Sequence, residues 1–208
     1  MNIVIAGARG RTAKELIKLL VSRGDTVTGI IRQDRQRGEI EALRATAVVA
    51  DLARDDLTTF VKGMDAVVFA AAGAAHEYEA IDHRAADRLA AAAEQAGVRR
   101  YILLSANGAH DPHSWGAAYA DYLGAKRAGE DCVKSRDLDW TVMRPAALGS
   151  GEGTGHITLL STPGGTGSID RKDVARTLVA VLDHDNTIGK TLELWRGNTP
   201  IEEAARAV

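Results

Sequence analysis

MNIVIAGARGRTAKEL, residues 1–16, joins an apolar run to a glycine-spaced turn and then to a helical pattern. The apolar run ends at Gly7, and Gly10 and Ala13 follow at regular spacing. Glycines at such a turn let the backbone approach a diphosphate closely, and the free N–H groups that open the next helix attract an anion. A purely structural strand–helix turn is the alternative. The strand before the turn and the helix after it favour a nucleotide site.

Short apolar runs alternate with helical patterns along the rest of the chain. Several runs are continuous Val, Ile, Leu and Ala, which is typical of parallel strands covered on both faces. The order predicts an α/β fold, a doubly wound, Rossmann-like parallel sheet with right-handed crossovers. We expect strands at 2–6, 26–31, 46–50, 66–71, 99–105 and 139–144, and helices at 11–23, 37–44, 55–62, 78–96, 117–136, 170–183 and 200–207.

Length and loop composition predict one domain over residues 1–208. No repeat, low-complexity stretch or linker divides the chain. Residues 149–168 are rich in Gly, Ser and Thr, and we expect there a mobile loop that carries one short strand near 156–160. Residues 146–208 are expected to contribute a small C-terminal lid on the substrate side.

The composition excludes several classes of function. The formal net charge is −2, so no bulk field favours nucleic acid or an anionic membrane. The one cysteine, Cys132, rules out an internal disulfide and a cysteine-rich zinc site. His110 and His113 share a polar loop without a third ligand, so no metal is expected. Apolar run 66–75 is too short to cross a bilayer, and strand-like sequence from residue 2 leaves no room for a signal peptide. We expect a cytoplasmic monomer or homodimer with no nucleic-acid or membrane partner.

The end of the second expected strand decides which nucleotide fits. A site for NAD usually places an acid about 20 residues after the glycines, where it binds the ribose 2′-hydroxyl. Arg32 stands at that place, and Arg9 and Arg11 lie in the glycine turn. A guanidinium there favours a 2′-phosphate, whereas solvated surface charges are the alternative. The sequence therefore predicts that NADP(H) is preferred over NAD(H).

Two further stretches extend the expected cofactor site. Asp51 and Leu52 follow the third strand, where side chains can meet an adenine edge. Ala71, Ala72 and Gly73 end the fourth strand, where small residues let a ribose or nicotinamide lie across the strand ends. Plain packing is the alternative for the alanines.

The candidate catalytic residues lie in the second half of the sheet. Ser105 ends the fifth strand, and Tyr122 and Lys126 share one face of a helix four residues apart. A nearby ammonium is expected to lower the pKa of the phenol, and a serine hydroxyl can hold a carbonyl oxygen beside it. This trio could protonate a carbonyl that receives hydride, or deprotonate an alcohol that gives it up. Tyr119, one turn before Tyr122, is a rival for the same face.

The motifs come in an order that resembles the short-chain dehydrogenase/reductase superfamily, and more narrowly its atypical NAD(P)H-binding, NmrA-like branch. The resemblance covers nearly the whole chain. It rests on the glycine turn, Asp51-Leu52, the alanine-rich fourth strand, Ser105, Tyr122-x-x-x-Lys126, 139–145 (DWTVMRP), 168–175 (SIDRKDVA) and 189–194 (GKTLEL). The chain departs from the family pattern at Ala13, in place of the third glycine, and after Ser105, where Ala-Asn-Gly replaces a run of hydroxyl residues.

The resemblance implies a role for each matching residue. Tyr122 and Lys126 would bind the nicotinamide ribose as well as catalyse, and Pro145 would shape the nicotinamide pocket. Asp51 and Leu52 would meet adenine. The diphosphate and the 2′-phosphate would be bound by Gly7, Arg9, Gly10, Arg11, Thr12 and Arg32.

Three functions agree with this resemblance. The leading one is an NADP-dependent oxidoreductase that transfers hydride to a small carbonyl, quinone or flavin. The second is an NmrA-like sensor that binds NADP(H) and signals through a partner without catalysis. The third is a small epimerase or dehydratase. Sugar-nucleotide epimerases carry a larger substrate domain than the stretch after Pro145 allows, so a small-molecule substrate is expected.

Overall fold

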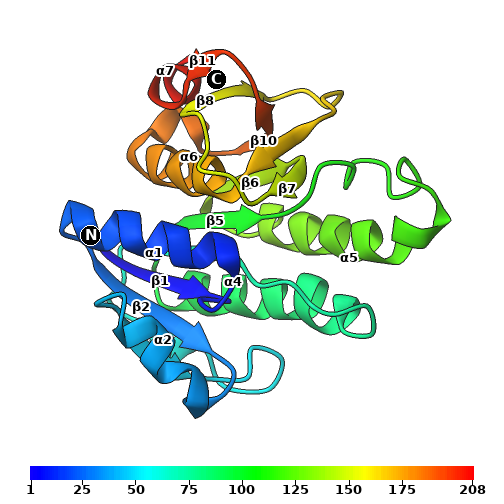
Figure 1. The fold of residues 1–208 in the computed structure, drawn as a ribbon. Helices are drawn as coiled ribbons and strands as arrows, with labels where there is room; N and C mark the ends of the chain where they lie inside the picture. Colours follow the sequence, from blue (N-terminus) through cyan, green and yellow to red (C-terminus); the bar gives the residue numbers. More distant parts are fainter.

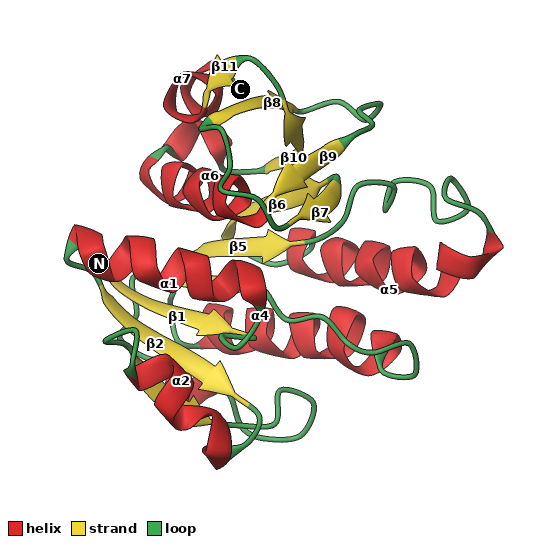
Figure 2. Cartoon of the chain, viewed as in Figure 1, coloured by secondary structure: helices red, strands yellow, loops and turns green.

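A computed structural model describes residues 1–208, and its centre is a nine-stranded sheet between two layers of helices (Figures 1 and 2). The strands are β1 (Asn2–Ala6), β2 (Thr26–Ile31), β3 (Thr46–Val49), β4 (Ala66–Phe69), β5 (Arg100–Leu104), β6 (Asp139–Pro145), β7 (Ala147–Gly149), β8 (His156–Leu160), β9 (Ser168–Asp170), β10 (Lys190–Arg196) and β11 (Thr199–Pro200). The sheet order is β11-β8-β10-β6-β5-β4-β1-β2-β3, and β7 pairs with β9 separately. The strands from β10 to β3 run parallel, whereas β8 is antiparallel to both β10 and β11. The predicted doubly wound α/β sheet is confirmed.

Helices cover both faces of this sheet. They are α1 (Arg11–Arg23), α2 (Arg37–Glu41), α3 (Thr58–Val61), α4 (Ala86–Gln95), α5 (Ala117–Lys134), α6 (Arg171–Asp183) and α7 (Ile201–Ala207), with 3₁₀ turns η1 (Asp34–Gln36) and η3 (Asp185–Thr187) and a π-helix η2 (Glu79–Ala85). One apolar core lies under α1, α2, α6 and α7, and a second lies under α3, η2, α4 and α5. The helices α1 and α6 pack against each other (Figure 1).

Some predicted elements differ from the observed ones. The helix expected at 55–62 shrinks to Thr58–Val61, and the one expected at 78–96 opens with the π-helix. Strand β8 was expected, but β7, β9, β10 and β11 were not among the predicted strands. In β10 a buried charged residue, Glu193, stands among the apolar side chains and interrupts the pattern that marks the other buried strands.

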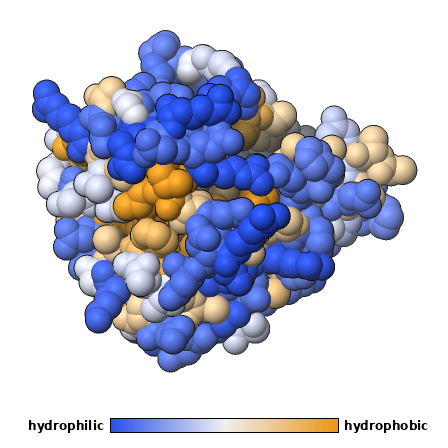
Figure 3. All heavy atoms as spheres, turned by 90° about the horizontal axis from the view of Figure 1, so that it is seen from below, coloured by the Kyte–Doolittle hydropathy of each residue, from blue (hydrophilic) through white to orange (hydrophobic).

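Short strands close both edges of the sheet. Strand β11 closes one edge with Thr199 and Pro200 alone, and the short strand β3 closes the other. Figure 3 shows a largely hydrophilic face with hydrophobic atoms gathered near its middle. No helix is both long enough and apolar enough to cross a membrane.

The helix α5 lies unusually close to the π-helix η2 at one glycine. A Cβ added at Gly129 would lie well inside van der Waals contact of the Asp82 carbonyl oxygen, and next to the side chain of Ala86. Any larger residue must push α5 away from η2. This contact sets the distance between the two elements that carry the polar residues described below.

Replacing Gly129 with alanine should therefore lower the free energy of unfolding by roughly 1–3 kcal/mol, because overpacking displaces backbone. Gly124→Ala is the matched control: it lies on the same helix and its Cβ would meet nothing within 4 Å. That control should gain stability, by about 0.5–1 kcal/mol, because alanine favours a helix. Urea denaturation checks both variants, and equal stability of the two would contradict the packing argument.

Candidate functional site

The glycine turn brings the ends of β1 and β4 into close contact. Gly7 has a φ of +76°, and a Cβ there would lie 2.5 Å from the Ala71 Cα and 2.6 Å from the Ala71 nitrogen. Only glycine combines this conformation with this approach. The Gly10 N–H donates to the Gly7 carbonyl at 2.8 Å, and Gly10 precedes α1, which has no side-chain cap. The N–H groups in the first turn of α1 are therefore available to an anion.

A cavity of about 390 Å³ opens beside this turn, at the carboxyl ends of β1 to β4. Its apolar part is formed by Ile30, Ile31, Ala50, Leu52 and Ile81, which suits a planar base. The predicted cofactor residues that line it are Gly7, Arg9, Gly10, Arg32, Asp51, Leu52, Ala71 and Ala72. The adenosine end of a dinucleotide fits this cavity. The glycine turn can accept a diphosphate, the apolar residues can contact the base, and Arg9 and Arg32 supply positive charge.

The charges at the cavity mouth are paired with acids that the sequence analysis did not identify. The Arg32 guanidinium donates to Glu77 at 2.7 Å, and Arg9 donates to Glu39 at 3.1 Å. The ion pair with Glu77 raises the pKa of Arg32 and lowers the pKa of the carboxyl, so both groups are ionised at neutral pH. Glu77 lies in a loop after β4 with no recognisable motif, and only the fold brings it to Arg32.

Six predicted cofactor residues lie outside this cavity, and two of them, Tyr122 and Lys126, are described below. Arg11 reaches towards the Ser150 hydroxyl at 3.5 Å, and Thr12 is buried in α1. Gly73 donates its N–H to a carboxylate described below, and Pro145 is buried at the end of β6. Arg11, Thr12 and Gly73 are near neighbours of the cavity wall in the chain, whereas Pro145 is distant from it in the chain.

Tyr122 and Lys126 lie on the buried side of α5, as their spacing predicts. The Lys126 ammonium is 5.9 Å from the centre of the Tyr122 ring, which also packs on Tyr78 with the ring centres 5.1 Å apart. Tyr119 is 51% exposed and meets the edge of Trp115 instead. Of the two tyrosines, Tyr122 is therefore the one beside the lysine.

The expected lowering of the phenol pKa is wrong. Burial raises the pKa of Tyr122, and the attraction of Lys126 offsets only part of this rise. Asp82 lies beside Lys126, and the negative charge of its carboxylate raises the pKa of the Tyr122 phenol, opposite to the effect of the ammonium. Tyr122 is thus a neutral phenol at physiological pH, able to donate a proton.

Asp82 links the tyrosine–lysine pair to the loop that borders the cavity. Its Oδ1 lies 2.9 Å from the Lys126 ammonium, in an ion pair outside hydrogen-bond geometry, and its Oδ2 accepts the Gly73 N–H at 2.9 Å. Lys126 also donates to the Leu104 carbonyl at 3.0 Å. Asp82 and Lys126 are both buried, and Asp82 lies in the π-helix η2, a type of distortion that often marks functional sites. The sequence gives no local signal for Asp82.

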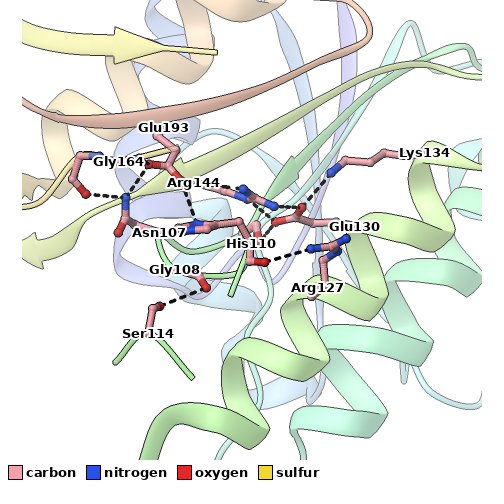
Figure 4. A network of polar contacts seen from close by, with 12 residues as sticks. Asn107, Gly108, His110, Ser114, Arg127, Glu130, Lys134, Arg144, Gly164 and Glu193 are labelled. Atoms are coloured by element: carbon pink, nitrogen blue, oxygen red, sulfur yellow. Dashed lines mark hydrogen bonds and ion pairs between the residues drawn. The ribbon is translucent and has the colours of Figure 1, made fainter. Parts of the chain in front are cut away.

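Ser105, expected to hold a carbonyl oxygen of the acceptor, is hydrogen-bonded within the protein. Its hydroxyl donates to Glu130 at 2.6 Å. The same carboxylate accepts two bonds from Arg144 and one from Lys134 (Figure 4). Although burial raises the pKa of Glu130, Arg144 and Lys134 hold it below its usual value. The structure therefore places the Ser105 hydroxyl in this buried ion-pair network.

A second buried carboxylate, Glu193, joins the two loops that flank this network. One of its oxygens accepts from the Asn107 amide at 3.0 Å and from the Gly164 N–H at 3.2 Å, and the other lies 3.4 Å from His110 (Figure 4). The loop after β5 and the loop before β9 are thereby fastened to β10. No group of three His, Cys, Asp or Glu side chains that could hold a metal is present.

Known proteins share this fold and part of this sequence. Residues 7–185 match a family model described as NAD(P)H-binding. The chain is 32% identical to a Bacillus subtilis protein named as an uncharacterized sugar epimerase, YhfK, over 99% of each chain. It is 34% identical to a solved structure from Bacillus halodurans described as an NAD-dependent epimerase/dehydratase, with a TM-score of 0.94 over the full length of both. The Lactococcus lactis oxidoreductase ylbE is 29% identical, with a TM-score of 0.89 over 100% of this chain and 96% of its own.

The buried pair of Asp82 and Lys126 predicts a strong effect of removing one charge. Asp82→Asn leaves the ammonium buried without a counter-ion and should lower the free energy of unfolding by about 3–5 kcal/mol. The double variant Asp82→Asn, Lys126→Met leaves no unpaired charge and should be more stable than the single one. Urea denaturation measures both, and a single variant as stable as the wild type would show that the pair is not coupled.

Proposed function

Since the chain belongs to the NAD(P)H-binding family, as its motifs predicted, we propose that it is an NADP-dependent oxidoreductase acting on a small carbonyl, quinone or flavin. The observation that carries the proposal is the continuous arrangement from the cavity to Tyr122. Gly73 follows Ala72 of the cavity wall and donates its N–H to Asp82, and Asp82 pairs with Lys126, whose ammonium lies 5.9 Å from the centre of the Tyr122 ring. This connection supports a cofactor site with a proton donor beside it.

Each group in this arrangement has a defined chemical part in the proposal. The nicotinamide cofactor supplies the hydride when it is bound. Tyr122, kept neutral by burial, donates a proton to the carbonyl oxygen of the acceptor. Lys126 orients the phenol and the cofactor ribose, and Asp82 fixes Lys126 in place. Arg32 favours the 2′-phosphate of NADP over the 2′-hydroxyl of NAD.

In this proposal the remaining predicted residues position the site and do not take part in proton transfer. Ser105 is engaged by Glu130, so we assign it to holding the end of β5 against α5 and not to contact with the acceptor. Pro145 borders the nicotinamide end, and residues 146–208 form the substrate side of the single domain. Glu193 supports that side, because it anchors both flanking loops.

A small epimerase is the second candidate. The names of the Bacillus relatives favour it, since one is called a sugar epimerase and the other an epimerase/dehydratase. An epimerase would use the same cofactor and the same phenol but would return the hydride to its substrate. It would show no net oxidation of added NADPH, which separates it from the leading proposal.

Arg32→Asp should weaken NADPH binding roughly tenfold to a hundredfold, because it removes a charge-assisted contact to the 2′-phosphate. NADH affinity should stay the same or improve. Arg35→Asp is the control, since Arg35 is a neighbouring exposed arginine outside the cavity wall. Isothermal titration with both nucleotides decides the matter, and equal weakening of both by Arg32→Asp would refute the 2′-phosphate assignment.

Tyr122→Phe removes one oxygen and keeps the ring packing on Tyr78. It should leave NADPH affinity within a few-fold and slow carbonyl reduction by roughly 10²–10⁴, the usual contribution of a general acid. Tyr119→Phe is the matched control and should keep full activity. The measurement is NADPH oxidation against a panel of aldehydes, quinones and flavins.

The same panel tests the non-catalytic alternative. A flavin or quinone can accept hydride directly, and Tyr122→Phe should then have little effect on the rate. A wild-type protein that binds NADPH tightly but oxidises it with no acceptor would favour the NADP(H) sensor and contradict the oxidoreductase.

A further inference from the structure

The loop between β4 and η2 delivers an acidic side chain to the nucleotide cavity. Gly73 packs closely on the backbone of Glu77, where a Cβ would lie 2.8 Å from the Glu77 carbonyl group, and the Glu77 N–H donates to the Ala74 carbonyl at 2.7 Å. This tight turn holds Glu77 in the cavity wall. Its carboxylate accepts the Arg32 guanidinium at 2.7 Å, and both side chains line the same cavity.

The ion pair between Arg32 and Glu77 crosses the carboxyl end of β1. Arg32 follows β2 and Glu77 follows β4, and these two strands lie on either side of β1 in the sheet. The glycine turn that is expected to take the diphosphate lies directly after β1. A nucleotide that enters the cavity therefore meets both members of the pair at the adenosine end, not the guanidinium alone.

Sites for NAD usually carry an acid at the end of the second strand, and this chain has Arg32 there. The fold supplies an acid at the same end of the cavity from a distant segment, so opposite charges meet where the 2′ substituent is recognised. A 2′-phosphate is attracted by Arg32 and repelled by Glu77, whereas a 2′-hydroxyl can donate to the Glu77 carboxylate.

On the basis of the proposed cofactor site, we infer that Glu77 is the residue that limits the preference for NADP over NAD. It competes with the 2′-phosphate for Arg32 and offers an acceptor to the 2′-hydroxyl. The pair is partly exposed, with Arg32 more than half accessible, and exposed ion pairs are weak. Competition by Glu77 thus reduces the discrimination without abolishing it, and the cavity accepts both nucleotides.

Glu77→Gln tests this inference, because it removes the charge and keeps the shape of the side chain. The probes are NADPH and NADH, together with adenosine 2′,5′-bisphosphate and AMP, which differ only in the 2′-phosphate. Titration calorimetry should show NADPH and the bisphosphate binding roughly threefold to tenfold more tightly to the variant. The affinities for NADH and AMP should stay the same or fall, so the preference for the phosphorylated member of each pair rises.

Two controls separate this effect from a general change of charge or structure. Glu79→Gln removes the same charge two residues away, where Glu79 pairs with His83 and Arg84 outside the cavity wall, and should leave the preference unchanged. In an Arg32→Gln background, Glu77→Gln should no longer raise the preference by the same factor, because the competition acts through Arg32.

The outcomes distinguish this inference from the proposed function. A preference that stays constant in Glu77→Gln, whatever happens to the individual affinities, would overturn the role of Glu77 and leave the cofactor site standing. Wild-type protein that binds none of the four probes would overturn the cofactor site, and the inference with it.

Discussion

The contact between Gly7 and the backbone of Ala71 is the constraint on which the rest of the site depends. It allows the ends of β1 and β4 to meet without a side chain between them, so that the turn before α1 remains open to a ligand. The loop after β4 then starts from a fixed position. From that loop come both the acid that faces Arg32 and the N–H group that binds Asp82. A larger residue at position 7 would therefore disturb several contacts at once.

Two buried ion pairs connect α5, the helix that carries Tyr122, to its neighbours. Asp82 and Lys126 join the cofactor loop to α5, whereas Glu130 and Arg144 join α5 to β6. The pair of Asp82 and Lys126 needs the close approach of α5 to η2 that Gly129 permits. The position of Tyr122 is thus set by packing between helices and by two buried ion pairs, and its neutral state follows from the same burial.

The fold and much of the cavity wall could be predicted from the sequence. The carboxyl ends of parallel strands meet at one edge, so residues that follow separate strands, such as Arg32 and Asp51, could be placed together without a structure. Glu77 and Asp82 could not be found in this way, because a tight turn and a π-helix bring them to the site and neither leaves a local pattern. The hydrogen bond of Ser105 depends on Glu130, which lies in another element. Strand β10 was not predicted because a charged residue, Glu193, interrupts its apolar pattern. The donors that allow this carboxylate to be buried come from distant loops.

The ends of the sheet determine how copies of this chain can associate. At one edge, β11 consists of Thr199 and Pro200 only, and proline has no N–H to donate to a further strand. The antiparallel strand behind it, β8, is paired with β10 on one side and with β11 at His156 and Ile157 on the other. Addition of a further strand beside Pro200 is therefore disfavoured, a common protection against aggregation.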